Sequence, residues 1–129
     1  MSRSKQSTLD FSGIELLPGA AKDIADLAKR YGKQFIMQLN KVMAYFNEYG
    51  DRIVDIDHHE RLKDVGVSYP LYSLHIKSKT YNIRAIATID DNNKLILSAF
   101  FERSDDNHRG YAAYIKKSIE RFESYQEIG

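Results

Sequence analysis

Apolar and polar residues alternate along three runs in the second half of the chain. The runs cover residues 71–78, 79–90 and 94–104, and each is rich in leucine, isoleucine, tyrosine or phenylalanine. Alternation with a period of two is typical of strands, because successive side chains point to opposite faces of a sheet. The Asp-Asp-Asn-Asn link at 90–93 consists of residues that tolerate the positive φ of a tight turn. The pattern therefore predicts a three-stranded antiparallel meander.

The same alternation assigns side chains to the two faces of this sheet. The apolar set shares one face and comprises Tyr72, Leu74, Ile76, Ile83, Ala85, Ala87 and Ile89. His75, Lys77 and Arg84 have the opposite parity, so we expect them to lie near one another on the other face. A sheet with one apolar face and one basic, hydrogen-bonding face is suited to hold a phosphodiester.

Helical spacing of apolar residues dominates the first half of the chain. A short apolar run at 13–17 predicts a first strand. Residues 20–32 and 33–50 place apolar side chains at intervals of three and four, which predicts two helices. Gly32 suits the end of the first helix, so we expect the pair to form a helical hairpin that covers the apolar face of the sheet.

Two further segments complete the predicted order of elements. Residues 51–70 mix charged and apolar side chains, and we expect a short helical turn at 59–64 with irregular chain elsewhere. Residues 111–127 place tyrosine, isoleucine and phenylalanine along one stripe, which predicts a last helix. The order strand, helix, helix, three strands, helix indicates an α+β fold with a small, mainly antiparallel sheet.

Length and composition limit the class of protein. A chain of 129 residues with 43% hydrophobic content fits one domain, which we place at 13–129 after a polar tail at 1–12 that we expect to be flexible. There is no cysteine and no apolar stretch of membrane-span or signal-peptide length, so we expect a cytoplasmic protein without membrane contact, disulfides or thiolate chemistry. The net charge is only +1, but residues 71–121 carry nine Lys and Arg against six Asp and Glu, which favours an anionic ligand.

Three short motifs resemble a known family. They are LKDVG followed by LYSLHIK, then IRAIATID, then AFFERS before an amphipathic helix. Over residues 14–125 their order and spacing are similar to the RelE/ParE superfamily of toxins from type II toxin–antitoxin modules, in particular its phage-derived, HigB-like branch. That family has Leu-Tyr-Glu-Leu-Arg, an arginine leading an apolar strand into an acidic turn, and Phe-Val-Lys-Lys at these places. The resemblance implies a RelE-like fold, with an N-terminal helical hairpin and a C-terminal helix around the sheet.

The resemblance also implies an activity and partners. The activity is endoribonucleolytic cleavage of messenger RNA, often on the ribosome, by attack of a ribose 2′-OH on the adjacent phosphate. It needs a base, an acid and cations for the developing charge, but no metal or cofactor. The partner is a small antitoxin, acidic or of the helix-turn-helix type, that covers the basic face. We expect tyrosines 72, 81 and 111 to be exposed anchors for it; the alternative, above all for Tyr81, is that they pack within the domain.

Four positions match the catalytic places of the family motifs. Arg84 matches the strand arginine and is expected to hold phosphate oxygens. Arg103 matches the second lysine of the Lys-Lys pair and would stabilise the leaving side. Glu102 replaces the first lysine, and a carboxylate there could act as general base. His75 stands where the family has arginine, and its ordinary pKa suits proton transfer at neutral pH.

The start of the last helix offers further candidates. His108 lies just before it, where some relatives place a functional histidine or tyrosine, and Tyr111 is the alternative because an aromatic ring can stack on a base. Lys77, Lys79 and Arg109 are expected to contact the RNA backbone. Residues 55–60 read Asp-Ile-Asp-His-His-Glu but lack histidines at i and i+4, so we expect a helix cap at Asp57 with exposed histidines there and no metal site.

Each of these residues also has a purely structural interpretation. Arg84 could be a solvated sheet-face arginine paired with an acidic residue, which would be removable without harm to the fold. Glu102 and Arg103 could form an ordinary edge-strand ion pair, and the lysines could be solvated. Two other functions therefore stay open: a ParE-like inhibitor of DNA gyrase, and a domain that keeps the fold and partner binding but has lost catalysis. Glu102 and the missing arginine at position 75 favour the last.

Overall fold

The computed structural model describes residues 13–56, 59–102 and 109–128. The expected tail at 1–12 lies outside this part of the chain. Within it, the elements follow the order β1 (Ile14–Leu16), α1 (Pro18–Tyr49), the 3₁₀ helix η2 (Gly50–Asp55), β2 (Glu60–Leu62), β3 (Leu71–Lys77), β4 (Asn82–Asp90), β5 (Asn93–Phe101) and α2 (Arg109–Ile128). The strands form one sheet in the order β1-β5-β4-β3-β2, in which β1 runs parallel to β5 and the other pairs are antiparallel. The α+β class and the mainly antiparallel sheet are confirmed.

The predicted meander is the centre of this sheet. β3 pairs with β4, and β4 pairs with β5 through a two-residue turn at Asp91 and Asn92. Both turn residues have positive φ, 52° and 70°, which is the requirement of the hairpin turn that matches the twist of the strands. Their short polar side chains tolerate this conformation, and the prediction from the Asp-Asn sequence is confirmed.

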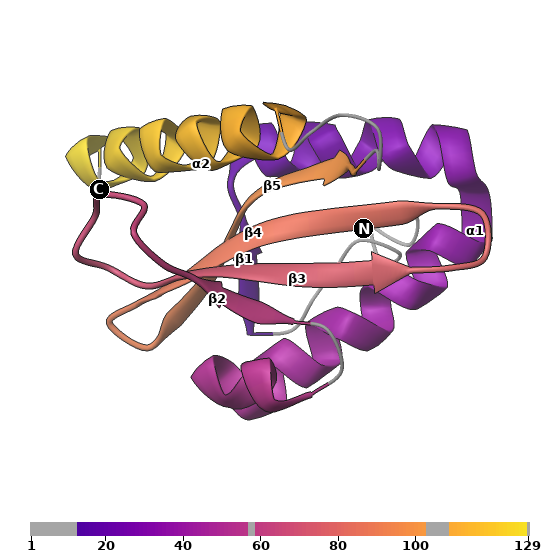
Figure 1. Cartoon of the computed structure of the whole chain (residues 1–129), viewed down its shortest axis with the longest axis horizontal. Helices are drawn as coiled ribbons and strands as arrows, with labels where there is room; N and C mark the ends of the chain where they lie inside the picture. Colours follow the sequence, from indigo (N-terminus) through magenta and orange to yellow (C-terminus); the bar gives the residue numbers. More distant parts are fainter. Residues whose placement is uncertain (1–12, 57–58, 103–108, 129) are drawn as a thin grey trace, which may run out of the picture.

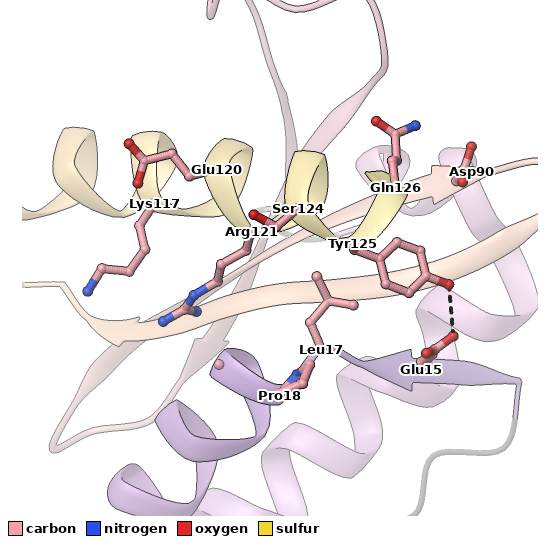
Figure 2. A pocket seen from close by; sticks show the side chains of 11 residues that line it. Glu15, Leu17, Pro18, Asp90, Lys117, Glu120, Arg121, Ser124, Tyr125 and Gln126 are labelled. Atoms are coloured by element: carbon pink, nitrogen blue, oxygen red, sulfur yellow. Dashed lines mark hydrogen bonds between the residues drawn. The ribbon is translucent and has the colours of Figure 1, made fainter. Parts of the chain in front are cut away.

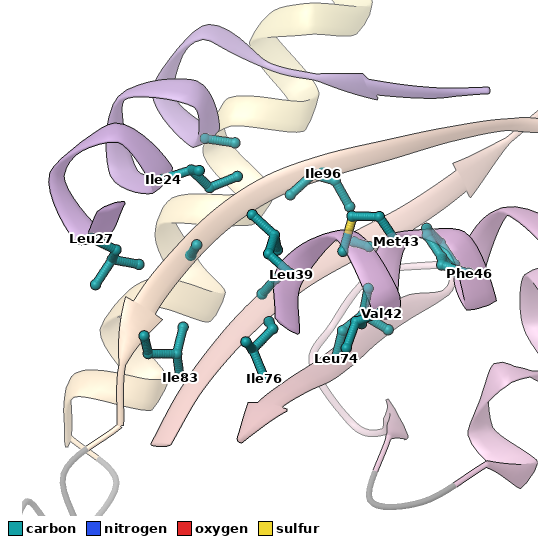
Figure 3. Packing of buried hydrophobic residues seen from close by; sticks show 14 of the residues in the cluster. Ile24, Leu27, Leu39, Val42, Met43, Phe46, Leu74, Ile76, Ile83 and Ile96 are labelled. Carbon is teal, nitrogen blue, oxygen red and sulfur yellow. The ribbon is translucent and has the colours of Figure 1, made fainter. Parts of the chain in front are cut away.

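Helix α1 covers one face of the sheet. Its backbone breaks at Gly32, whose φ of 74° and ψ of −155° are not helical, so the chain forms two helical segments that meet there. Figure 3 shows residues of both segments, such as Ile24 and Leu39, directed toward strand residues such as Ile76. The predicted helix pair, its break at Gly32 and its cover over the apolar sheet face are therefore confirmed.

Helix α2 covers the opposite face, where the sequence predicted a basic surface. Figure 1 shows the sheet between α2 and the second half of α1. Under α2 the sheet is apolar and contributes Leu71, Ile86, Leu95, Leu97 and Phe100, which pack with the buried Phe122 of α2. The prediction of a wholly basic face was wrong, because the helix needs an apolar surface to bury its own stripe. Polar strand residues gather mainly toward one end of this face, although the buried Ser98 of β5 bonds Ser118 of α2.

Two other predictions are corrected. Residues 60–62 form the edge strand β2, paired with β3, and not the helical turn expected at 59–64. Tyr72 and Tyr81 are 3% and 5% exposed and belong to the core under α1, so they are not exposed anchors. Tyr81 packs edge-on to Phe35 with ring centroids 6.2 Å apart.

Among the described residues, no helix combines the length and apolar character needed to cross a membrane.

Candidate functional site

Polar side chains gather on the α2 face of the sheet, beyond the apolar part that α2 covers. They come from four strands or strand ends and from the first turn of α2. We call this group the Arg84 cluster; it consists of Glu60, Ser73, His75, Asn82, Arg84, Glu102 and Tyr111. The pairing of β2, β3 and β4 sets Glu60 opposite Ser73 and His75 opposite Arg84.

The guanidinium of Arg84 is the centre of the cluster. Its Nε donates to Glu102 Oε1 at 2.9 Å, and the side chains of these two residues are only 13% and 16% exposed. Its Nη1 lies 3.4 Å from Ser73 Oγ and 3.6 Å from Glu60 Oε2. A charged group with so little access to water needs such partners, since its desolvation is otherwise costly. The expected pairing with acidic residues is therefore confirmed, whereas the expectation of a solvated arginine is wrong.

Tyr111 lies over this guanidinium. The Cζ atom of Arg84 is 5.8 Å from the centre of the Tyr111 ring, within the range of a cation–π contact. The Tyr111 hydroxyl donates to Ser73 Oγ at 2.5 Å and lies 3.3 Å from Glu60 Oε2. The Phe100 ring packs against the Tyr111 ring, with a centroid distance of 5.5 Å and an interplanar angle of 60°. The ring is half-buried by these contacts.

Burial raises the pKa of Tyr111 above its ordinary value of 10.0. The hydrogen bond to Ser73 and the charge of Arg84 lower this pKa in part. The carboxylates of Glu60 and Glu102 raise it again, because they repel a phenolate. Tyr111 is consequently a neutral phenol at physiological pH and acts in the cluster as a hydrogen-bond donor.

Glu102 connects Arg84 with His75. The backbone N–H of Glu102 donates to the carbonyl of Asn82 at 2.7 Å, so the strand pairing fixes the two residues side by side. The Asn82 Nδ2 group donates to Glu102 Oε1 at 3.4 Å, and its Oδ1 contacts Nε2 of His75. The Glu102 carboxylate thus orients the Arg84 guanidinium directly. It orients the His75 imidazole through the side-chain amide of Asn82.

His59 has a structural role that the sequence did not predict. It is 6% exposed, and its Nδ1 accepts a hydrogen bond from the backbone N–H of His75 at 2.9 Å. This N–H lies beyond the paired residues of β2, and the imidazole supplies its hydrogen-bond acceptor. The expectation of exposed histidines is wrong for His59, whereas Asp57 and His58 lie outside the described residues. In the described ranges no three His, Asp or Glu side chains are grouped as metal ligands.

The structure brings four of the predicted residues together: His75, Arg84, Glu102 and Tyr111. Lys77 and Lys79 are exposed, one at the end of β3 and one in the turn after it. Arg103 and His108 lie outside the described residues. Arg109 begins α2, but its side chain is outside the described part as well.

The sequence missed Glu60, Ser73 and Asn82 as members of the cluster. Ser73 and Asn82 share strand parity with His75 and Arg84, so alternation alone could have indicated them. Glu60 could not be indicated, because the strand that carries it was not predicted. With Glu60 and Glu102 facing Arg84, carboxylates outnumber the guanidinium here, contrary to the basic character expected.

A groove of about 910 Å³ lies at the other end of α2, between that helix and β1 (Figure 2). Tyr125 crosses it, with its hydroxyl 3.3 Å from Glu15 Oε1. Arg121 faces the groove but is held by Asp23 at 2.9 Å and by the carbonyl of Leu97 at 2.7 Å. No member of the Arg84 cluster lines it. None of the described histidines lines the groove, whereas the Arg84 cluster combines a guanidinium, two carboxylates and an imidazole, so the Arg84 cluster is the better candidate for chemistry.

No family model, curated protein or solved structure matches this chain.

Proposed function

We propose that this protein is the toxin of a type II toxin–antitoxin module and cleaves messenger RNA as a metal-independent endoribonuclease. The observation that supports the proposal is the Arg84 cluster itself. It holds a guanidinium, two carboxylates and an imidazole at one end of a sheet, and these are the groups that cleavage through a 2′-OH requires. The motifs that resemble the RelE/ParE superfamily contribute three of them.

Arg84 is proposed to bind the scissile phosphate. A planar guanidinium can donate two parallel hydrogen bonds to phosphate oxygens, and these bonds strengthen as negative charge develops. In the protein alone the carboxylates of Glu102 and Glu60 neutralise this charge. Substrate binding would replace the longer Glu60 contact of 3.6 Å and keep the 2.9 Å bond to Glu102, which orients the guanidinium.

Glu60 is proposed to be the general base. Its side chain is 53% exposed and can therefore meet a ribose 2′-OH, whereas Glu102 is 16% exposed and is bound by Arg84 and Asn82. The carboxylate would take the proton of the 2′-OH as the oxygen bonds to phosphorus. His75 would supply a proton to the 5′ oxygen as the P–O5′ bond breaks, after its Nε2 exchanges Asn82 for that oxygen. The products are a cyclic phosphate and a 5′-OH.

The test compares two glutamates in expressed protein. Glu60→Gln should reduce the rate of RNA cleavage about 10²–10⁴-fold, the usual effect of losing a general base. Glu48→Gln is the matched control, since Glu48 is an exposed carboxylate on α1. The measurement is the mapping of new 5′-OH ends in total RNA after induction. Equal cleavage by wild type and Glu60→Gln would refute the role of Glu60, and no cleavage by folded wild type would refute the activity.

The proposed partner is an antitoxin, a small acidic or helix-turn-helix protein encoded nearby. Lys77 and Lys79 are exposed at the end of the sheet that carries the cluster, and acidic groups of a partner could pair with them. Relief of growth arrest on co-expression, together with a stable complex, is the result that supports such a partner.

One observation favours a second candidate, a toxin-like domain that binds its partner but no longer cleaves RNA. Arg84 is occupied by two carboxylates, as an arginine with a structural role would be. This candidate predicts a stable complex with the neighbouring gene product and unchanged RNA after induction. The RNA-end mapping separates the two functions.

A further inference from the structure

Tyr111 occupies the approach to Arg84. Its ring lies over the guanidinium, and its hydroxyl uses Ser73 Oγ, which Arg84 also contacts. The hydroxyl also lies within reach of Glu60, the carboxylate with the most solvent access in the cluster. A phosphate that replaces Glu60 at Nη1 must enter beside Ser73 and Glu60, where the Tyr111 hydroxyl lies. The contacts by which Tyr111 joins the cluster therefore also block the access of a ligand to Arg84.

The rest of α2 is fixed to the sheet independently of Tyr111. Ser118 Oγ and Ser98 Oγ form a buried hydrogen bond of 2.7 Å, and Phe122 is 1% exposed in the core. Arg121 is tied to Asp23 of α1. By contrast, the two residues that follow Tyr111, Ala112 and Ala113, are exposed. The beginning of the helix can therefore separate from the sheet without loss of the contacts that hold its middle and end.

We propose that Tyr111 is an autoinhibitory latch: it closes the Arg84 cluster in the resting protein, and single-stranded RNA enters only when the first turn of α2 lifts from Ser73. The proposal rests on the proposed function for the identity of the ligand. Its physical content is a competition, because the phosphate and the Tyr111 hydroxyl require the same space beside Ser73 and Glu60, at Nη1 of Arg84. This reverses the sequence prediction for Tyr111, in which the ring would stack on a base and improve binding.

The two roles predict opposite signs for the same substitutions. Tyr111→Phe keeps the ring and loses the bonds to Ser73 and Glu60, and one neutral hydrogen bond is worth about 1 kcal/mol, or about 5-fold in an equilibrium. A latch therefore predicts that Tyr111→Phe binds RNA about 5-fold more tightly than wild type, and that Tyr111→Ala binds at least as tightly as Tyr111→Phe. A stacking residue predicts weaker binding by Tyr111→Ala and no gain in Tyr111→Phe.

The experiment measures the affinity of the full chain for a short single-stranded RNA with 2′-O-methyl riboses, which cannot be cleaved. Tyr125→Phe is the control, since that hydroxyl bonds Glu15 at the far end of α2 and should not alter the affinity. Amide hydrogen exchange is the second readout. Amides of residues 112–115 should exchange faster in Tyr111→Phe, while those near Phe122 should not change.

Each outcome decides between the latch and its alternatives. Tighter RNA binding with faster exchange at 112–115 supports the latch. Unchanged or weaker binding by both Tyr111 variants overturns it. If neither wild type nor variants bind RNA, the proposed ribonuclease function is wrong. Faster exchange in Tyr111→Phe would then still support the contact by which Tyr111 closes the cluster. Unchanged exchange in that case overturns the latch as well.

Discussion

The ion pair between Arg84 and Glu102 is expected to stabilise the fold, and a double-mutant cycle measures by how much. Arg84→Met keeps much of the length of the side chain and removes its charge. It leaves the Glu102 carboxylate 16% exposed, with the 3.4 Å bond from Asn82 as its remaining described contact. Breaking a buried pair by removing one partner typically costs about 3–5 kcal/mol. Because water reaches part of this pair, we expect Arg84→Met to lower the free energy of unfolding by about 2–4 kcal/mol.

Glu102→Gln is expected to cost less. The amide oxygen of glutamine can still accept from Arg84 Nε, and Glu60 still neutralises the guanidinium. The loss is the difference between a charge-assisted and a neutral hydrogen bond, about 1 kcal/mol. The double variant should be more stable than the sum of the two losses predicts, with a coupling of about 1–3 kcal/mol, because neither charge is then left alone.

Urea unfolding followed by far-UV circular dichroism measures these differences. With a slope of about 2 kcal/mol per molar urea, the loss in Arg84→Met corresponds to a midpoint lower by about 1–2 M. A loss below about 0.5 kcal/mol with additive single effects would refute the reasoning, since Arg84 would then behave as a solvated surface arginine. If the expected loss is observed, inactive Arg84 variants must be compared with wild type under conditions in which both are folded.

Two further predictions concern pH and the edge of β3. Burial raises the pKa of Tyr111, so the folded state favours the neutral phenol, and this stabilisation is present below the ordinary pKa of 10.0 and is lost as pH rises through the higher folded value. The free energy of unfolding should therefore fall above about pH 10, and less steeply in Tyr111→Phe; equal alkaline profiles would contradict this. His59→Phe should cost about 1–3 kcal/mol in urea unfolding because the His75 N–H loses its acceptor, whereas His59→Asn, which offers an oxygen at a similar place, should retain most of the stability. Equal losses in the two variants would show that the imidazole contributes by packing alone.

Local sequence patterns determined a large part of the fold. Alternation placed Arg84 and His75 on the same face, and β3 and β4 set them directly opposite each other. The Asp-Asn turn and the helix break at Gly32 could also be predicted from the sequence, because each depends on a positive φ that one or two residues must adopt. The apolar face under α1 follows from the same alternation.

Edge strand β2 could not be predicted from the sequence. It has three residues, Glu60, Arg61 and Leu62, and a run of this length and charge carries no period that distinguishes a strand from a helical turn. Its conformation comes from pairing with β3, whose partner residues lie nine to 13 residues further along the chain. Missing the strand meant missing Glu60, and with it the acidic side of the cluster.

The sequence by itself determined the face on which each candidate residue lies, and the tertiary structure decided what covers that face. Parity is local, because side-chain direction alternates with every residue of a strand. The partners of Arg84 are not local: Glu102 is 18 residues away, and Tyr111 bonds Ser73 across 38 residues. Only the docking of α2 on the apolar half of the sheet brings Tyr111 over the guanidinium. That docking depends on the burial of Phe122 and its apolar neighbours, a property of the assembled core that no single segment contains.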